Sequence, residues 1–338
     1  MDTFWQTLKR PIFALAPLSG VTDSSFRQVC KGCGADLVYS ELASVAALVH
    51  SPRSTLEMIR FDPVERPYIV QLFGSNPEYF ARAAELVTEK INPDGIDINF
   101  GCPAPKVTRQ GAGAALMTNL PLAREVVESV ITHTDLPVSI KVRIAVKEME
   151  LNPFLEYMSG LDIKAIMIHG RTYAQRFSGP VSFERTRNAR HSFGGVLLAN
   201  GGAMNAEKGI ELLRETGADG IGVARGALGN PWIFRELKAR LNGGPSWTLS
   251  TEEMFETAMK HAQLAEGLKG WRGILEMRKH LCWYIQGIPD AGKIRQKLAV
   301  VKSLKEVEDI LGSIAARPPQ LSRYNISLNQ SAGSSPVQ

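Results

Sequence analysis

One stretch of this chain decides its fold: Gly95-Ile96-Asp97-Ile98-Asn99-Phe100-Gly101-Cys102-Pro103. Its first five residues form a mainly apolar run that predicts a buried strand. The Gly/Pro turn that follows can continue neither a sheet nor a helix. Cys102 is therefore offered at the C-terminal end of a strand. In a parallel α/β protein, active sites form at this edge of the sheet.

Seven further short apolar runs predict strands, at Ile12 to Leu18, Leu37 to Ser40, Tyr68 to Phe73, Val138 to Val142, Ala165 to His169, Val196 to Asn200 and Gly220 to Ala224. Amphipathic stretches lie between them, and two of these begin after the capping residues Asn76 and Asn205. Strands that are apolar on both faces are typical of a parallel sheet covered by helices. Their number and spacing predict an α/β fold, a (β/α)₈ TIM barrel. An open doubly wound sheet is the alternative, disfavoured because no Gly-x-Gly-x-x-Gly follows the first run.

The composition changes after the last predicted strand. We expect a barrel domain over residues 1–242, a linker over 243–250, a small helical bundle over 251–313 and a disordered tail over 314–338. Ser250 and Glu253 have capping-box spacing at the start of the bundle. Glycines predict breaks in its helices at 267–273 and 287–289. The tail is rich in Ser, Pro, Asn and Gln, a composition that cannot bury a core.

The overall composition is that of an ordinary globular protein. Of its 338 residues, 44% are hydrophobic and 22% charged, and the net charge is +5. No run approaches the ~18 apolar residues of a membrane helix, and no signal peptide is visible. We expect a cytoplasmic monomer with no metal site. Cys30 and Cys33 have redox spacing, but only two other cysteines exist for a zinc site, and we interpret the pair as structural.

Polar residues end several of the predicted strands and are candidates for chemistry. Cys102 can exchange a proton with a bound ring, or it can be a small buried hydrophobe. Lys141 lies within a strand, so its ammonium needs an anion, a flavin carbonyl or an internal salt bridge. Arg143 can join Lys141 or pair with a loop carboxylate. The segment 110–117, rich in small residues, is expected to be a loop that closes over the site, or simply a tight connection.

The last strands end in groups that suit phosphate. His169 can bind phosphate or a ring carbonyl, and Arg171 can bind phosphate or a nucleobase. Gly201 and Gly202 let backbone N–H groups approach an anion, and Arg225 follows the eighth strand, a combination that favours a phosphorylated cofactor. At the first and third strands, the candidates for the polar edge of a ring are Ala16, Pro17, Leu18 and Gln71.

The predicted helical bundle is strongly basic. Residues 267–305 contain nine Lys and Arg residues and two acidic residues, which gives this segment a net charge of +7. Trp283 and Tyr284 follow basic residues, a combination that suits folded RNA. The alternative is a solvated helix face over an aromatic core. Candidate contacts to RNA are Arg272, Arg278, Lys279, Lys293 and Lys297.

Together, these motifs resemble the tRNA-dihydrouridine synthases, with the overall pattern nearest the bacterial B-type branch. The resemblance runs from about Ile12 to Leu311 and is carried by Ala16-Pro17-Leu18-Ser19-Gly20-Val21-Thr22-Asp23, Gln71-Leu72-Phe73-Gly74, Asn99-Phe100-Gly101-Cys102-Pro103, Lys141-Val142-Arg143, His169-Gly170-Arg171-Thr172, Asn200-Gly201-Gly202, Ala224-Arg225-Gly226 and Asn230-Pro231-Trp232. Two positions depart from the family pattern. Gly202 stands where Asp is common, and Ala224 where Gly is common.

The resemblance implies an FMN-dependent enzyme that uses NADPH to reduce a uridine of tRNA. Hydride would pass from reduced FMN to carbon 6 of uracil, and Cys102 would give a proton to carbon 5. Asn99 and Arg171 would contact the uracil. FMN would contact Ala16, Pro17, Leu18, Gln71, Lys141, His169, Asn200, Gly201, Gly202, Ala224 and Arg225.

Two other functions are compatible with the same residues. An FMN-dependent dehydrogenase of free pyrimidines, such as dihydroorotate, also uses a barrel and a loop cysteine, but it has no use for a basic helical domain. An RNA chaperone or scaffold with a vestigial barrel would bind no flavin.

Overall fold

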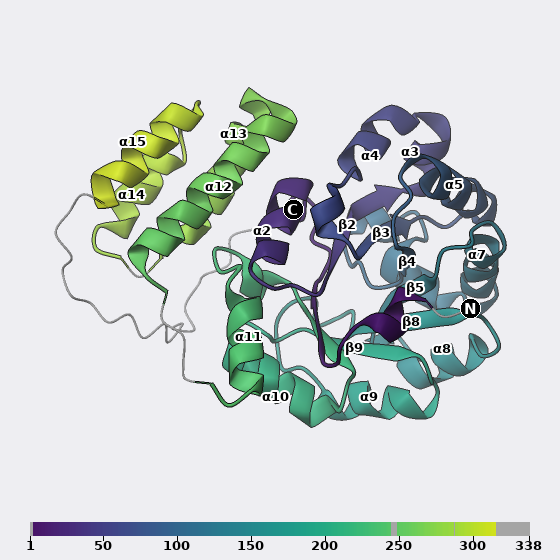
Figure 1. Ribbon diagram of the computed structural model, residues 1–338. Helices are drawn as coiled ribbons and strands as arrows, with labels where there is room; N and C mark the ends of the chain where they lie inside the picture. The colour runs from purple at the N-terminus through teal and green to yellow at the C-terminus, as the bar shows by residue number, and fades with distance from the viewer. Residues whose placement is uncertain (1–2, 245–248, 287, 316–338) are drawn as a thin grey trace.

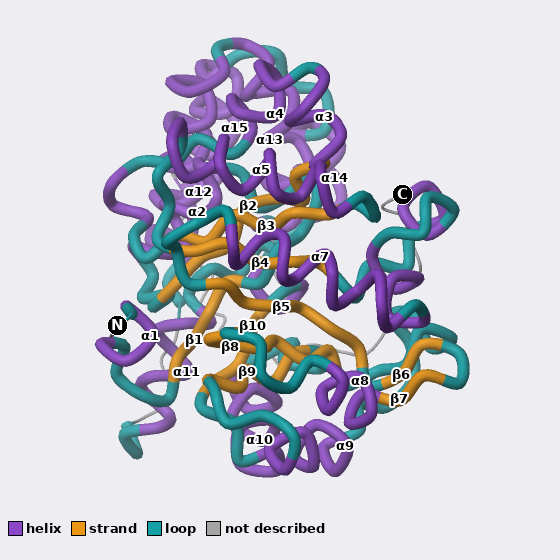
Figure 2. Tube along the Cα trace, turned by 90° about the vertical axis from the view of Figure 1, so that its right-hand side faces the viewer, coloured by secondary structure: helices purple, strands orange, loops and turns teal. Residues whose placement is uncertain are grey.

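The computed structural model describes residues 3–244, 249–286 and 288–315 (Figure 1). Eight parallel strands close into a barrel in the order β1-β10-β9-β8-β5-β4-β3-β2, which confirms the predicted TIM barrel. They are β1 (Ile12–Leu15), β2 (Leu37–Ser44), β3 (Tyr68–Phe73), β4 (Gly95–Asn99), β5 (Val138–Arg143), β8 (Ile163–His169), β9 (Val196–Asn200) and β10 (Gly220–Val223). Figure 2 shows these strands at the centre, with helices around them.

The helices fall into two groups along the chain. Around the barrel lie α1 (Phe4–Thr7), α2 (Ser24–Gly32), α3 (Val45–His50), α4 (Pro52–Met58), α5 (Pro77–Lys90), α6 (Pro105–Thr108), α7 (Leu120–Thr132), α8 (Leu151–Tyr157), α9 (Phe183–Asn188), α10 (Ala206–Thr216) and α11 (Ile233–Leu241). On the α2 side of the barrel lie α12 (Thr251–Lys269), α13 (Trp271–Tyr284), α14 (Ala291–Leu298) and α15 (Leu304–Ala315), with α12 and α13 nearest to α2 (Figure 1). Short 3₁₀ turns occupy Pro63–Glu65, Gly113–Thr118, Ala189–His191 and Arg225–Ala227.

Alternation along the strands explains both the core and the site. In β4, Ile96 and Ile98 pack into the outer core between strands and helices. The alternate positions face the barrel interior, because side chains of a strand alternate between its faces. An apolar cluster fills that interior. It contains Trp5 of α1 and residues of β1, β2, β3, β8 and β9. At the C-terminal edge the inward residues become polar, and Asn99 is one of them.

Some strand limits differ from the sequence prediction. β1 ends at Leu15, before Pro17, which has no N–H to continue the ladder. β2 runs on to Ser44 because its register against β3 shifts between Tyr39 and Leu42, which accommodates an irregular stretch. The hairpin of β6 (Ala145–Val146) and β7 (Met149–Glu150) was not predicted, because two-residue strands leave no periodic signal.

The C-terminal helices begin as predicted. The Ser250 side chain accepts a hydrogen bond from the backbone N–H of Glu253 at 3.1 Å. Helix α12 continues through Gly267, and the chain turns only at Gly270, whose φ of 59° suits glycine. Helix α15 reaches Ala315, two residues beyond the predicted limit of the bundle. Residues 245–248 of the predicted linker, Gly287 and residues 316–338 of the predicted tail lie outside the described residues.

The CxxC pair lies in and just after α2, and both thiols are buried and free. Burial raises the pKa of the Cys33 thiol to about 11 and raises that of Cys30 as well. Neither side chain is a ready thiolate, so the interpretation of the pair as structural stands. Among the described residues, no helix combines the length and apolarity needed to span a membrane.

Barrel closure depends on a residue without a side chain. A Cβ at Gly220 of β10 would lie 2.1 Å from the carbonyl oxygen of Ile12 in β1. We expect Gly220→Ala to lower the free energy of unfolding by about 1–3 kcal/mol or more, since the two strands must separate. Gly194→Ala is the matched control, because nothing lies within 4 Å of its Cβ position. Urea denaturation of both variants measures the difference, and equal stabilities would contradict this view of the closure.

Candidate active site

The strand register gathers the predicted polar residues at one edge of the barrel. Asn99 of β4 pairs with Lys141 of β5, and His169 of β8 pairs with Asn200 of β9. All four are inward-facing residues at or near the C-terminal ends of their strands. Gln71 of β3 pairs with Asp97 of β4, two residues before Asn99 on the same inward face. This is the edge at which barrel enzymes carry their active sites.

A chain of buried hydrogen bonds crosses this edge, and we call it the Asp97–Gln71–Asn99 chain. The Asp97 carboxylate accepts from Ser139 Oγ at 2.7 Å and from Gln71 Nε2 at 2.6 Å. Gln71 Oε1 in turn accepts from Asn99 Nδ2 at 3.0 Å. Asp97 and Gln71 are fully buried, and burial raises the pKa of Asp97 to about 6. Asp97 was not predicted as a site residue, although it lies two residues before Asn99 on the same strand face.

At its Asn99 end, the Asp97–Gln71–Asn99 chain holds the backbone of the turn that carries Cys102. Asn99 Oδ1 accepts from the backbone N–H of Cys102 at 2.9 Å and from that of Gly101 at 3.2 Å. On the other side, Ala114 N–H donates to the Cys102 carbonyl at 3.1 Å. A Cβ at Gly113 would lie 2.9 Å from that carbonyl oxygen, so only glycine fits. The Cys102 side chain stays partly exposed at the mouth of the barrel.

The segment 110–117 is therefore packed behind Cys102. Most of its residues from Ala112 to Met117 are buried, and Gly113–Thr118 forms a 3₁₀ turn. Gln110 and Gly111 are exposed at the start of this segment, and a loop that closes over the site stays a prediction. Small residues are needed here for close packing against the cysteine turn, which is the tight connection considered as the alternative.

Lys141 has no salt bridge, so that alternative is not realised among the described residues. Its Nζ donates to Asn200 Oδ1 at 3.1 Å, and Asn200 Nδ2 donates to the Gly222 carbonyl at 2.7 Å. Burial, with the nearby charge of Arg143, lowers the pKa of Lys141 to about 8, although Asp97 acts in the opposite direction. An ammonium held this way is poised to gain from an added anion.

Arg143 neither joins Lys141 nor pairs with a loop carboxylate. Its guanidinium donates to the carbonyls of Gly101 at 2.7 Å, Thr172 at 2.9 Å and Arg176 at 2.9 Å. It is almost completely buried. Arg143 thus ties the cysteine turn to the loop after β8, a structural role that three correctly placed carbonyls make possible and that residue type alone does not reveal.

A second cluster surrounds the ends of β8, β9 and β10. Arg171 Nη1 lies 3.4 Å from His169 Nε2, and the Arg225 guanidinium lies 5.5 Å from the ring of Phe177. Gly201 follows with φ of 99°, and a Cβ there would lie 2.7 Å from the His169 ring. Phe177, which was not predicted as a site residue, is 53% exposed in the loop after β8. Burial and four neighbouring cations hold the pKa of His169 far below its ordinary value.

This cluster fits a bound phosphate. Arg171 and Arg225 have no ion pair with a carboxylate among the residues that the structure describes. The depressed pKa of His169 has burial as its largest cause and the neighbouring cations as its second. Glycines at positive φ leave backbone N–H groups open beside it, an arrangement that suits anions. A phosphorylated ring cofactor would thus find its phosphate partners near β8–β10 and its ring partners near β1, β3 and β5.

The remaining predicted cofactor residues line the same edge. Ala16 and Pro17 are buried after β1, and Leu18 is half-buried. Ala16 N–H donates to the Val223 carbonyl at 2.8 Å, next to Ala224. Gly202, with φ of 83°, packs against Val181. These residues offer mainly backbone and apolar surface.

The predicted RNA contacts lie on the C-terminal helices in different environments. Arg278 donates to the carbonyls of Val301 at 2.8 Å and Val300 at 3.2 Å, so its guanidinium binds the turn between α14 and α15. Lys279 donates to the carbonyl of Gly20, in the loop after β1. Exposed positions are held by Arg272, Lys293 and Lys297. Tyr284 packs inward at 1% exposure, as the alternative of an aromatic core predicts.

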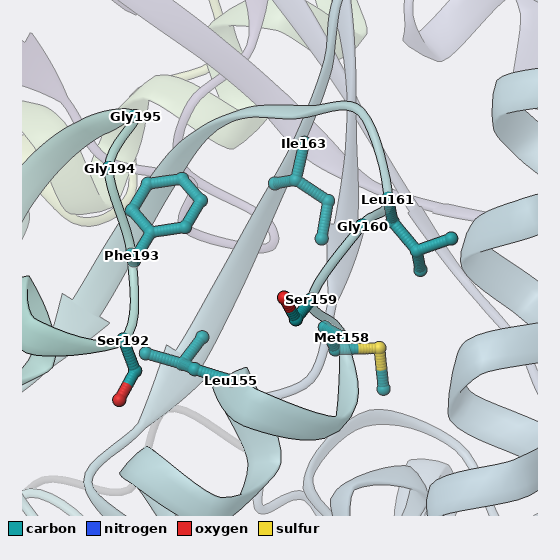
Figure 3. A pocket seen from close by; sticks show the side chains of 10 residues that line it. All are labelled: Leu155, Met158, Ser159, Gly160, Leu161, Ile163, Ser192, Phe193, Gly194 and Gly195. Atoms are coloured by element: carbon teal, nitrogen blue, oxygen red, sulfur yellow. The ribbon is translucent and has the colours of Figure 1, made fainter.

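A small cavity of about 200 Å³ lies elsewhere, between the end of α8 and the starts of β8 and β9 (Figure 3). Its walls are apolar side chains, serines and glycines, among them Leu155, Ile163 and Phe193. It opens at the N-terminal ends of the strands, opposite Cys102. Without charged groups and on the face that stabilises barrels, it is no candidate for the active site.

Comparison with known proteins decides the family. A family model described as "Dihydrouridine synthase (Dus)" matches residues 14–317. The chain belongs to the dihydrouridine synthase family. It is thus an enzyme, a flavin-dependent oxidoreductase. The match covers all of α12–α15 and the barrel except the first two residues of β1.

Similar proteins come from several bacteria. "Probable tRNA-dihydrouridine synthase 1" of Synechocystis is 32% identical, covering 88% of this chain and 84% of its own length. "tRNA-dihydrouridine synthase B" of Pseudomonas syringae is 34% identical with 87% of each covered, and that of Pasteurella multocida is 33% identical with 88% and 91% covered. Among solved structures, the old yellow enzyme homologue of Zymomonas mobilis has a TM-score of 0.51 at 15% identity, covering 71% of this chain and 91% of its own. That likeness concerns the fold alone.

Proposed function

We propose that this dihydrouridine synthase reduces a specific uridine of tRNA to 5,6-dihydrouridine, with bound FMN and with NADPH as the electron donor. The observation that carries the proposal is that the barrel mouth holds both a cationic cluster suited to phosphate and a partly exposed cysteine whose backbone is hydrogen-bonded in place. The names of the curated relatives supply the class of substrate. The cytoplasm, where tRNA and NADPH meet, is the proposed location.

Each group at the mouth has a role in this reaction. FMN, when bound, supplies hydride for carbon 6 of the uracil ring. His169, Arg225, Gly201 and Gly202 would hold its phosphate, and Lys141 would face its ring. Asn99 can donate only one further N–H, because Gln71 accepts the other, and Arg171 completes recognition of the uracil carbonyls. Cys102 would donate the proton to carbon 5 as the general acid.

The uridine must leave its stack to reach the mouth. Unstacking costs a few kcal/mol, less in a loop, and the basic helices beside the barrel offset part of this by binding the tRNA backbone. A dehydrogenase of free pyrimidines would need neither contribution. The presence of these helices within the family match therefore favours tRNA as the substrate.

The test is a map of dihydrouridine in tRNA from cells that lack this protein and any overlapping synthase. We expect one or a few positions to return to uridine and to be restored by the wild-type gene. The purified protein should be yellow and should form dihydrouridine in that tRNA with NADPH. An unchanged map, together with turnover of free pyrimidines by the purified protein, would contradict the proposal and favour the small-molecule dehydrogenase.

The lowered pKa of Lys141 predicts pH-dependent flavin binding. With a pKa of about 8, Lys141 is mainly charged at pH 7 and mainly neutral at pH 9. If the bound flavin requires the ammonium, affinity of the apoprotein for FMN should fall about tenfold between pH 7 and pH 9. Fluorescence titration of FMN measures this. Lys141→Met should bind weakly at both pH values, and a wild-type affinity that is equal at both would contradict the role of Lys141.

A further inference from the structure

The turn between α12 and α13 exposes the largest apolar side chains of the C-terminal helices. Trp271 is 63% exposed and Leu268 is 52% exposed. The Arg272 guanidinium lies 5.7 Å from the centre of the Trp271 ring, and Arg272 has no ion pair with a carboxylate among the described residues. Gly270 separates the two helices. We call Leu268, Trp271 and Arg272 the tip.

The tip is held beside the barrel mouth. Lys269 Nζ lies 2.7 Å from Asp23 Oδ2, at the start of α2. Consecutive Cα atoms are 3.8 Å apart, so the Trp271 backbone lies within about 8 Å of the Lys269 backbone. Lys279, two turns further along α13, binds the carbonyl of Gly20. Both partners belong to the segment that leaves the C-terminal end of β1, on the same face as Cys102.

Helix α13, which carries the tip, is closely packed along its length. Near its start, Gly273 packs so closely on α12 that a Cβ would lie 2.0 Å from the Ala265 carbonyl. Near the end of α13, a Cβ built on Gly229, in the segment after β10, would lie 2.1 Å from the Trp283 carbonyl oxygen. Between them, His280 packs on Phe26 of α2 with ring centres 5.1 Å apart. The tip is thus carried by a helix that packs on α12, on α2 and on the barrel segment around Gly229, and α2 lies between α13 and the barrel in Figure 1.

An exposed tryptophan with a guanidinium against its ring suits one class of partner. Aromatic faces bind unstacked nucleobases, and arginine adds cation–π attraction and pairing with phosphate. The local charge of +7 over residues 267–305 complements a polyanion. When a uridine swings out of its stack into the mouth, the bases on either side lose a stacking partner.

We propose that the tip is a stacking platform, on which Trp271 covers an unpaired base of the tRNA strand next to the target uridine while Arg272 contacts the adjoining phosphate. The inference rests on the proposed function, because it needs tRNA as the substrate. It assigns to Trp271 a role in binding the flanking strand, separate from the chemistry at Cys102.

Steady-state kinetics with tRNA test the platform. Trp271→Ala should raise KM about 5- to 150-fold, the value of one lost base stack, and leave kcat nearly unchanged. Trp271→Phe should recover most of the loss because it keeps an aromatic face. Tyr157→Ala, which removes another exposed aromatic ring from α8, should behave as wild type. Flavin content and NADPH oxidation without tRNA should be unchanged in all variants.

The outcomes separate the platform from the proposed function. If wild-type protein forms dihydrouridine in tRNA and Trp271→Ala has the same KM, the platform is wrong and the function stands. If the wild type forms none, both fall. An equal loss for Phe and Ala would exclude stacking. Sedimentation of a dimer that Trp271→Ala converts to a monomer would instead assign the tip to contacts between copies of this chain.

Discussion

Replacement of Cys102 by alanine should lower the rate of dihydrouridine formation by about 10²- to 10⁴-fold, the usual contribution of a positioned general acid. Flavin binding should persist, because the cationic cluster suited to phosphate lies around His169 and Gly201, at the ends of β8 and β9, whereas Cys102 follows β4. The loss should appear in kcat rather than in KM for tRNA, since the proton is transferred only in the transition state. Mass spectrometry of the product tRNA and flavin absorbance measure the two properties.

The variant should fold, because the turn is held by its backbone. Asn99 Oδ1 accepts from the N–H of residue 102, and Ala114 donates to its carbonyl, whatever the side chain. Alanine keeps the Cβ that packs near Gly113. A changed melting temperature is therefore not expected, and activity can be compared at equal amounts of folded, yellow protein.

Cys282→Ala provides a matched control. This thiol is also free and partly exposed, but it lies on α13 and points to the Arg295 carbonyl at 3.6 Å. It should retain wild-type turnover. Wild-type turnover by Cys102→Ala, with the control equally active, would show that another group supplies the proton.

The fold was predictable because its signal is local. Each strand of the barrel is a short apolar run, and helix starts such as Asn76 and Ser250 carry their own capping residues. The polar ends of strands were predictable for the same reason. Asn99 and His169 stand where apolar alternation stops, and parallel strands bring their ends to one edge.

What the sequence could not predict depends on pairs of residues far apart in the chain. Arg143 and Lys279 were expected to meet charged partners, yet both bind backbone carbonyls that only the folded loops place there. The segment 110–117 has the composition of a loop, but its small residues pack against Cys102. The role of Asp97 was not predictable either, because a single acidic residue in a strand does not indicate which residues of the neighbouring strands it binds.

Asp97→Asn should stabilise the protein at neutral pH while weakening its flavin site. The asparagine oxygen can accept from Gln71 Nε2, and its amide can donate to Ser139 Oγ, so both neighbours keep a partner. What is removed is a buried charge. Among the described residues, Lys141 is the cation that acts on this carboxylate, and it is itself only weakly basic.

The sign of the pH dependence follows from the pKa of Asp97, about 6 in the folded protein against an ordinary value of 3.8. A raised pKa means that the folded state prefers the protonated form. This contribution to stability is complete below about pH 4 and is lost as the pH rises through 6. At pH 7 the ionised group costs about 3 kcal/mol, because a tenfold change in proton affinity corresponds to about 1.4 kcal/mol. Asp97→Asn should therefore gain up to about 3 kcal/mol at pH 7 and nothing near pH 4.

The same substitution should cost function, which is a reason for the carboxylate to be there. The Asp97 charge favours the ammonium form of Lys141, so its removal lowers the pKa of Lys141 below 8. FMN affinity of the variant should then begin to fall at a lower pH than in the wild type. Denaturation at pH 7 and 4.5 and FMN titration measure the two effects. Asp162→Asn, at a side chain 65% exposed, should change the unfolding free energy by less than about 0.5 kcal/mol. If Asp97→Asn gives no stability gain at pH 7, or the same gain at both pH values, Asp97 is not a buried carboxylate with a raised pKa. If FMN affinity falls over the same pH range as in the wild type, Asp97 does not support the charge of Lys141.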